Sequence, residues 1–219
     1  MTDAPRATDR RQLAKLQEPK TTKWPRTDRR VARLTAAIAR RQPDLTVVIE
    51  NVHDPHNISA VLRSCESIGM LRVHTIYTEE EPPRKAFART TSASAAKWVE
   101  VVHHSSVDAC LARLRVEGFT ILATGLSEAS TDLYETNLCR PTAIVVGNEM
   151  RGVSNEAQSL ADGQLSIPML GMIESLNISV ACAVILYEAL RQRRLDGQYD
   201  VPKLAARERD ELVAEWLTR

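Results

Sequence analysis

After Pro43 the chain alternates short runs of β-branched and apolar residues with segments of helical periodicity. Helical patterns at about 57–68, at about 106–117 and after Val153 separate these runs, and a last one follows residue 177. The strand-like runs are TVVIENV (46–52), RVHTIYT (72–78), WVEVVHH (98–104), FTILATGL (119–126), AIVVGNE (143–149) and QLSIPM (164–169). This alternation predicts an α/β fold, with a mostly parallel sheet covered by helices on both faces.

The two ends of the chain read differently from this core. Residues 1–27 are basic, interrupted by prolines and typical of a flexible arm, with a short helix near 8–17. Residues 28–41 show helical spacing, and a last helical pattern covers about 203–217. We therefore expect an N-terminal arm (1–27), one main domain that includes the helix after it (28–197) and a C-terminal helical extension (198–219).

The charge of the chain is unevenly distributed. Residues 1–44 hold 12 of the 29 Lys and Arg residues but only 5 of the 28 Asp and Glu residues, although the formal net charge is +1. A basic segment of this kind can neutralise phosphates, so nucleic acid is the first partner to consider. The alternative is a solvated tail that binds nothing.

Cysteine and histidine spacing gives no metal or disulfide pattern. No C-x-x-C pair occurs, and His103 and His104 are expected to end a strand rather than to bind metal. The cysteines are far apart, at Cys65, Cys110, Cys139 and Cys182. The most apolar segment, VACAVILY at 180–187, is too short to cross a bilayer, and no signal core begins the chain. We expect a cytoplasmic protein without a membrane partner.

Ligands of open α/β sheets bind beyond the carboxyl ends of the strands, so the loops after the strand-like runs are the candidate site. The suggestive loops are 51–57, 123–128, 147–152 and 168–177. None carries G-x-G-x-x-G or a Walker A pattern, and glycine makes up only 8 of 219 residues. A dinucleotide oxidoreductase, the commonest methyltransferase fold and a P-loop ATPase or GTPase are therefore disfavoured.

Taken singly, the polar residues of these loops have ordinary explanations. Asn57 can cap the helix that follows it, and the stem of Arg63 can cover apolar neighbours on that helix. Glu149 can bind backbone amides, and Ser175 and Asn177 can satisfy the first amides of the last core helix. Only their combination is specific.

Three motifs occur in order along the chain: N-V-H-D-P-H-N-x-x-x-x-x-R at 51–63, I-V-V-G-N-E-x-x-G at 144–152 and I-P-M-x-G-x-x-x-S-L-N-x-S-V-A at 167–181. Together they closely resemble the motifs of the SpoU-type methyltransferases in the SPOUT superfamily, over about residues 28–194. The resemblance implies transfer of a methyl group from S-adenosylmethionine to a ribose 2′-hydroxyl of RNA, without a metal. It also implies a C-terminal trefoil knot and a homodimer.

Site roles follow from the same resemblance. The catalytic residues it implies are Arg63, Asn57, Glu149, Ser175 and Asn177. The residues it implies for binding S-adenosylmethionine are Thr124, Gly125, Gly147, Ile167, Met169, Ser175 and Leu176. Gly171 would allow a tight turn in the donor-binding loop, and the polar start of the last core helix would face the active site.

The resemblance favours guanosine 18 in the D-loop of tRNA as the target. The alternatives are a 2′-hydroxyl of ribosomal RNA and a non-catalytic RNA-binding protein or RNA chaperone on the same scaffold. Aromatic residues are only 4% of the chain, which favours recognition of a folded RNA by shape. The candidate RNA-binding residues are Arg29, Arg30, Arg33, Arg40, Arg41, Arg191, Arg193 and Arg194.

Overall fold

The computed structural model describes residues 27–79, 81–83 and 95–219. Residues 1–26 of the arm, with the short helix expected near 8–17, lie outside the described residues.

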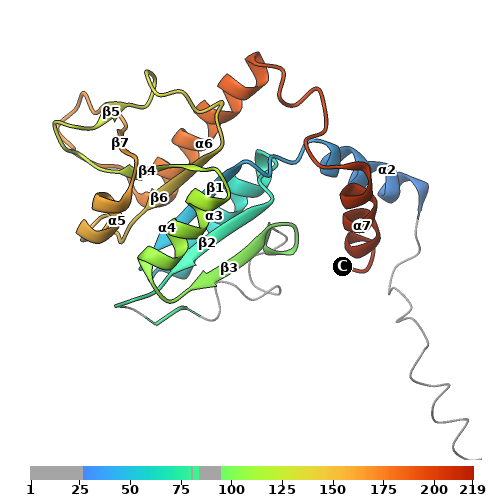
Figure 1. The fold of residues 1–219 in the computed structure, drawn as a ribbon, viewed down its shortest axis with the longest axis horizontal. Helices are drawn as coiled ribbons and strands as arrows, with labels where there is room; N and C mark the ends of the chain where they lie inside the picture. The colour runs from blue at the N-terminus through green and yellow to red at the C-terminus, as the bar shows by residue number, and fades with distance from the viewer. Residues whose placement is uncertain (1–26, 80, 84–94) are drawn as a thin grey trace, which may run out of the picture.

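Seven parallel strands form one sheet in the order β3-β2-β1-β6-β4-β7-β5 (Figure 1). The strands are β1 (Leu45–Glu50), β2 (Arg72–Ile76), β3 (Glu100–His104), β4 (Thr120–Thr124), β5 (Thr131–Asp132), β6 (Thr142–Val146) and β7 (Gly163–Ser166). The parallel α/β prediction is confirmed. Because β6 lies between β1 and β4, segments far apart in the sequence end side by side.

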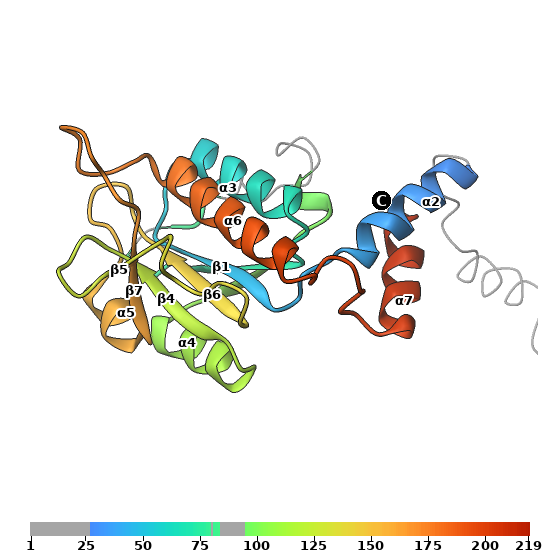
Figure 2. The same ribbon diagram turned by 90° about the horizontal axis from the view of Figure 1, so that it is seen from above.

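Helices cover both faces of the sheet, as Figure 2 shows. One face is covered by α3 (Pro55–Ser67) and α6 (Ile178–Leu195), and the other by α4 (Val107–Val116) and α5 (Asn155–Leu160). The 3₁₀ helix η1 (Ala95–Lys97) packs against α3. The first helix of the described chain, α2 (Asp28–Ala39), and the last, α7 (Ala206–Trp216), pack together beside the sheet (Figure 2). None of the helices within the described ranges is long and apolar enough to span a membrane.

Local chemistry sets where the core helices begin. Asp54 accepts a hydrogen bond from the backbone of α3, whose first residue is a proline that has no N–H to lose. Ser106, Ser154 and Asn177 cap α4, α5 and α6 in the same way. Each of the six strand-like runs was predicted longer than the strand that forms; β6, for example, ends at Val146, so that Glu149 lies in the following loop. The two-residue β5 has no sequence signal.

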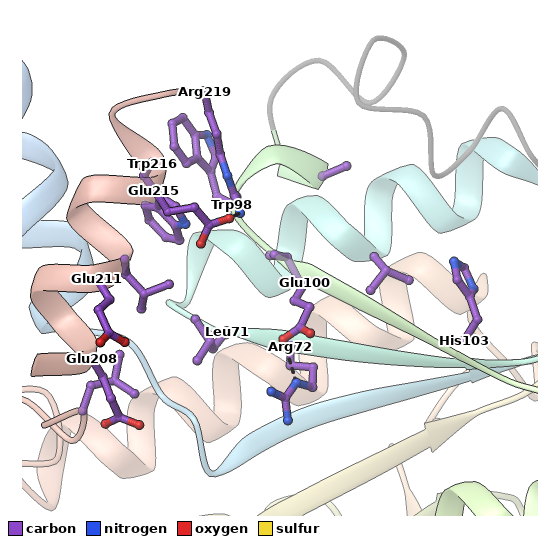
Figure 3. Close-up of a pocket in the computed structure, with 15 residues that line it drawn as sticks. Leu71, Arg72, Trp98, Glu100, His103, Glu208, Glu211, Glu215, Trp216 and Arg219 are labelled. Atoms are coloured by element: carbon purple, nitrogen blue, oxygen red, sulfur yellow. Dashed lines mark hydrogen bonds and ion pairs between the residues drawn. The ribbon is translucent and has the colours of Figure 1, made fainter. Parts of the chain in front are cut away.

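Buried apolar residues form one cluster on each face of the sheet. A third cluster joins α2 to α7 through Ile38 and Trp216. The Trp216 ring also lies 5.0 Å from that of Trp98, between centroids, and the two rings are tilted by 56°. Beside these rings, α7 and the β3 edge enclose a cavity of about 660 Å³ with glutamates along its α7 wall (Figure 3). The C-terminal extension is therefore packed against the chain's first described helix.

Two of the candidate RNA-binding arginines are buried, so the expectation that they contact RNA is wrong. The Arg41 side chain is 2% exposed, donates to the Met70 carbonyl over 2.7 Å, pairs with Glu66 at 3.3 Å and lies over the Trp216 ring. The Arg193 side chain is 0% exposed. Buried carbonyl groups need donors, and these two guanidiniums supply them.

Arg193 connects the end of α6 to the starts of two strands. It donates to the carbonyl oxygens of Leu138 (2.9 Å) and Arg140 (2.8 Å), which precede β6, and to the Asp44 carboxylate (2.7 Å), which precedes β1. Burial alone would raise the pKa of Asp44, but hydrogen bonds from Lys203 and Arg193 outweigh it and lower the pKa below its ordinary value. The pair therefore stabilises the fold while Asp44 is ionised.

Replacing Arg193 with leucine should lower the free energy of unfolding by about 3 kcal/mol near neutral pH, because buried carbonyls lose their donor and Asp44 keeps only Lys203. The pKa of Asp44 is lower in the folded chain, so its pairing is present above the ordinary pKa and is lost as the pH falls through the lowered value. The difference from wild type should therefore narrow below about pH 4. Urea denaturation of the wild type and the variant at several pH values measures the loss of stability and its narrowing at low pH.

Arg194→Leu is the matched control. Arg194 is the next residue on α6 and is exposed. Its removal should change stability by no more than about 0.5 kcal/mol. Equal losses for the two variants would show that the Arg193 network is not the connection described.

Candidate active site

The carboxyl ends of β4, β6 and β7 and the start of α6 enclose a cavity of about 660 Å³. It lies where ligands bind in open parallel sheets, and its volume is typical of small-molecule sites. The structure brings all the expected donor-binding residues into its lining: Thr124, Gly125, Gly147, Ile167, Met169, Ser175 and Leu176. Glu149 and Asn177 line it as well.

A chain of side-chain hydrogen bonds runs along the rim of this cavity. The buried Asn57 on α3 donates from Nδ2 to Glu149 Oε1 at 2.8 Å and accepts at Oδ1 from Asn177 Nδ2 at 3.1 Å. A carboxylate can only accept, so Glu149 fixes the orientation of the Asn57 amide and thereby that of Asn177. Asn177 Oδ1 then accepts from the backbone N–H of Ser179 at 2.9 Å and caps α6. Asn177 therefore caps α6 and also belongs to the rim of the cavity.

Arg63 is not among the residues that line the cavity of its own chain. It lies on α3, six residues beyond Asn57, and its side chain is exposed. Six residues correspond to about 9 Å along a helix. The guanidinium is therefore exposed to solvent at some distance from Asn57, and the cavity forms without it.

The loop after β6 folds back on itself so tightly that it requires glycine. A Cβ atom on Gly147 would lie 2.1 Å from the carbonyl carbon of Gly152, a distance that no side chain can occupy. Backbone hydrogen bonds in both directions between Asn148 and Gly152, at 2.9 and 2.8 Å, close the turn. Gly171 differs: its φ is not positive and a Cβ there would meet nothing within 4 Å. The backbone at 171 therefore does not require glycine.

Asn51, which was assigned no role from the sequence, joins three strand ends. Its backbone has φ of 50°, and its Oδ1 accepts from the backbone N–H of Thr78 at 2.9 Å. Its carbonyl accepts from Asn148 Nδ2 at 2.8 Å, which connects the loop after β1 to the loop after β6. Asparagine tolerates left-handed backbone better than most residues. Its position as the first residue of the motif at 51–63 is the sequence signal that could have identified it.

Tyr77 also went unassigned. Its hydroxyl donates to the Val52 carbonyl at 3.0 Å, under the loop that leads into α3. Burial, and secondly the Glu149 carboxylate, raise the pKa of Tyr77 above its ordinary value, so the phenol stays protonated. Nothing in the run RVHTIYT distinguishes it from an ordinary strand residue.

The remaining candidate RNA-binding arginines lie at the surface. Arg30 is half-buried, and Arg191 is paired with Glu188. The exposed ones are Arg29, Arg33 and Arg40 on or next to α2 and Arg191 and Arg194 near the end of α6. These groups can reach a phosphate without disturbing the core.

Comparison with known proteins matches this geometry to a family. The model of the SpoU rRNA Methylase family matches residues 44–187, a range that contains all three motifs. The chain belongs to the SpoU methylase family.

Relatives of this SpoU chain cover most of its length. It is 45% identical over 194 residues to a tRNA (guanosine(18)-2′-O)-methyltransferase of Thermus thermophilus, covering 89% of this chain and 98% of the relative. The solved A. aeolicus TrmH/SpoU tRNA modifying enzyme superposes with a TM-score of 0.80 at 37% identity, covering 87% of this chain and 95% of that one.

A further SpoU structure was solved with a methyl donor. The SpoU methyltransferase AviRb of Streptomyces viridochromogenes, in complex with the cofactor AdoMet, matches with a TM-score of 0.59 and 28% identity. The match covers 70% of this chain and 59% of that one.

Gly147→Ala tests the tight loop that walls the cavity. The added methyl group must displace the Gly152 backbone, so stability should fall by at least about 2 kcal/mol. Gly171→Ala, on another loop of the same rim, should change it by less than about 0.5 kcal/mol. Thermal or urea unfolding of both variants is the measurement, and similar values would contradict the close approach.

Proposed function

We propose that this chain transfers a methyl group from S-adenosylmethionine to the ribose 2′-hydroxyl of guanosine 18 in tRNA. The observation that carries the proposal is the cavity at the strand ends: one pocket gathers every residue expected to bind the donor, with Glu149 and Asn177 on the rim. The 45% identity to a tRNA (guanosine(18)-2′-O)-methyltransferase over 89% of the chain favours tRNA as the substrate.

The residues of the cavity fit such a donor. Leu165, Ile167 and Ile178 give it apolar walls for a nucleoside, and the absence of a side chain at Gly147 leaves backbone at its surface. Glu149 and Glu174 place carboxylates at a cavity that would receive a cationic sulfonium compound. S-adenosylmethionine supplies an activated methyl group whose leaving group is a neutral thioether.

The chain's own residues then have to orient the ribose hydroxyl. Arg63 is a poor general base, because a guanidinium stays protonated far above neutral pH. We assign it instead to the substrate phosphate and hydroxyl, where its planar fork fixes the oxygen in line and stabilises negative charge on it. Asn57 and Asn177 are positioning residues, and Ser175, exposed just before α6, is available to the substrate.

RNA binding is assigned to the exposed arginines of α2 and of the end of α6. Arg29, Arg33 and Arg40 lie on or beside one helix that packs against α7, and Arg194 is exposed near the C-terminal end of α6. Contacts of this type hold the phosphate backbone and carry little sequence information. Selection of guanosine 18 is therefore left to the shape of the RNA and the cavity mouth.

A homodimer, a trefoil knot and a cytoplasmic location complete the proposal. Exposed apolar side chains in the single chain support the dimer: Val180 and Tyr187 on α6 lie on one helical face, and Leu170 and Met172 project from the loop before it. Four free cysteines suit a reducing compartment. The knot rests on family membership.

Ribosomal RNA is the second candidate substrate, because the matching family model bears that name. Transfer of labelled methyl to three RNAs separates the readings: an unmodified tRNA transcript, the same transcript with adenosine at position 18, and 23S ribosomal RNA. We expect incorporation only into the first. Incorporation into ribosomal RNA alone would move the target, and donor binding without transfer to any RNA would favour the non-catalytic alternative.

Arg63→Ala should lower kcat/KM for tRNA at least ~100-fold in this assay, because the hydroxyl loses its orientation. Arg63→Lys should lose most of the activity too, because an ammonium lacks the planar fork. Arg207→Lys, an exposed arginine on α7 outside the cavity, is the control and should be unchanged. Near full activity in Arg63→Lys would refute the fork geometry.

The dimer is tested by Tyr187→Glu. Tyr187 is 52% exposed on α6, and a carboxylate there would be buried without a partner if α6 forms the interface. Light scattering should give twice the chain mass for the wild type and a shift to monomer for the variant. Val116→Glu, 90% exposed at the end of α4 on the other face of the sheet, should stay dimeric. A monomeric wild type would overturn this part of the proposal.

A further inference from the structure

Three metal-ligating side chains converge away from the candidate active site. His74 on β2, His104 on β3 and Cys110 on α4 each offer one ligand atom, and the three atoms lie within 4.8 Å of one another. His74 and Cys110 are buried and His104 is half-buried. The histidine rings are stacked, with centroids 5.2 Å apart.

The strand register brings these residues together. His74 pairs with Val102 across the parallel ladder, and side chains alternate between faces, so His104 lies on the same face as His74. Helix α4 covers this face and points Cys110 into its core cluster. His103 faces the other way, bonds Thr75 Oγ1 at 2.7 Å and lines the α7 cavity of Figure 3. His104 is therefore a candidate ligand, and His103, on the opposite face of the sheet, is its matched control.

The two imidazoles of the cluster contact each other. His74 Nδ1 and His104 Nε2 share a hydrogen bond of 2.9 Å, in which one ring donates and the other accepts. Neutral imidazole is the form that binds metals.

The distance between the two histidine nitrogens is close to that in a tetrahedral zinc centre. Two nitrogens bound to Zn²⁺ at about 2.0–2.1 Å are separated by about 3.3 Å, so the histidine nitrogens need to separate by only a few tenths of an ångström. The hydrogen-bonding proton moves to the far nitrogen of its ring. His104, which is half-buried, is the most exposed of the three side chains.

The surrounding charges balance. Arg72 bonds Glu100 at 2.9 Å, and Arg113 bonds Glu117 at 2.9 Å, so each nearby guanidinium is paired with a carboxylate. Cys110 lies in the apolar cluster under α4, and its thiol would release its proton to solvent on binding a metal.

We propose that His74, His104 and Cys110 bind one Zn²⁺-class ion, with water as fourth ligand, that joins the edge strand β3 to β2 and α4. The site lies on the α4 face of the sheet, opposite Asn57 on α3 and Asn177 before α6. It is independent of methyl transfer, so it stands or falls without the proposed function.

Cobalt titration of the full chain, purified with chelator and then freed of it, tests the site. Co²⁺ at one equivalent should give a thiolate charge-transfer band and tetrahedral d–d bands, and Zn²⁺ should abolish both. Cys110→Ser should lose the charge-transfer band, whereas Cys139→Ser, a half-buried cysteine outside the cluster, should keep it.

His104→Gln should weaken Zn²⁺ affinity at least ~10-fold, and His103→Gln should leave it unchanged. Zn²⁺ should also raise the melting temperature of the wild type and of His103→Gln, but not of His104→Gln. A wild-type spectrum without the charge-transfer band, a band that survives in Cys110→Ser, or equal affinities for the two histidine variants would each overturn the proposal. Circular dichroism confirms that the variants are folded.

Discussion

The insertion of β6 between β1 and β4 is the constraint on which the site depends. Parallel strands end at one edge, so this order places the loop after β6 between the loops after β1 and β4. Gly147 lets the central loop fold back within van der Waals distance of itself, and Asn51 and Asn148 connect it to the loop after β1. A pocket walled by backbone then forms at the point where the strand order changes direction, as expected for open parallel sheets.

The orientation of each rim amide follows from a single carboxylate. Glu149 can only accept, so Asn57 turns its Nδ2 toward it, and Asn177 must then donate to Asn57. Asn177 Oδ1 accepts from the backbone N–H and the hydroxyl of Ser179, whereas each Nδ2 keeps a second N–H and Asn57 Oδ1 keeps a second lone pair. The second Glu149 oxygen and Ser175 at the cavity are also available to a substrate, and the proposed mechanism adds the exposed Arg63.

Motifs indicate which residues meet at the strand ends, and sequence reasoning fails where a residue's partner is distant. The residues that the family resemblance implies for donor binding, Gly147 among them, line one cavity, and their role stays a prediction. Arg41 and Arg193 had the same spacing and charge as the exposed arginines, and only tertiary carbonyls distinguish them. Likewise, no spacing rule links His74 to His104 and Cys110, because β2, β3 and α4 bring them together.

The buried arginine at the end of α6 and the asparagine at its start have related consequences. Helix α6 runs antiparallel to the strands, so that Asn177 meets the rim of the cavity while Arg193 binds Asp44 and the residues before β6 at the opposite edge of the sheet. The helix is thus fixed at both ends to the two strands, β1 and β6, that carry the motif loops. Next to Arg193, Gln192 donates to the Thr136 carbonyl at 2.9 Å and accepts from the Leu138 N–H at 2.8 Å, so several polar contacts hold the C-terminal end of α6. Together with the bond from Asn177 to Asn57 at its start, they fix where the helix lies along the sheet.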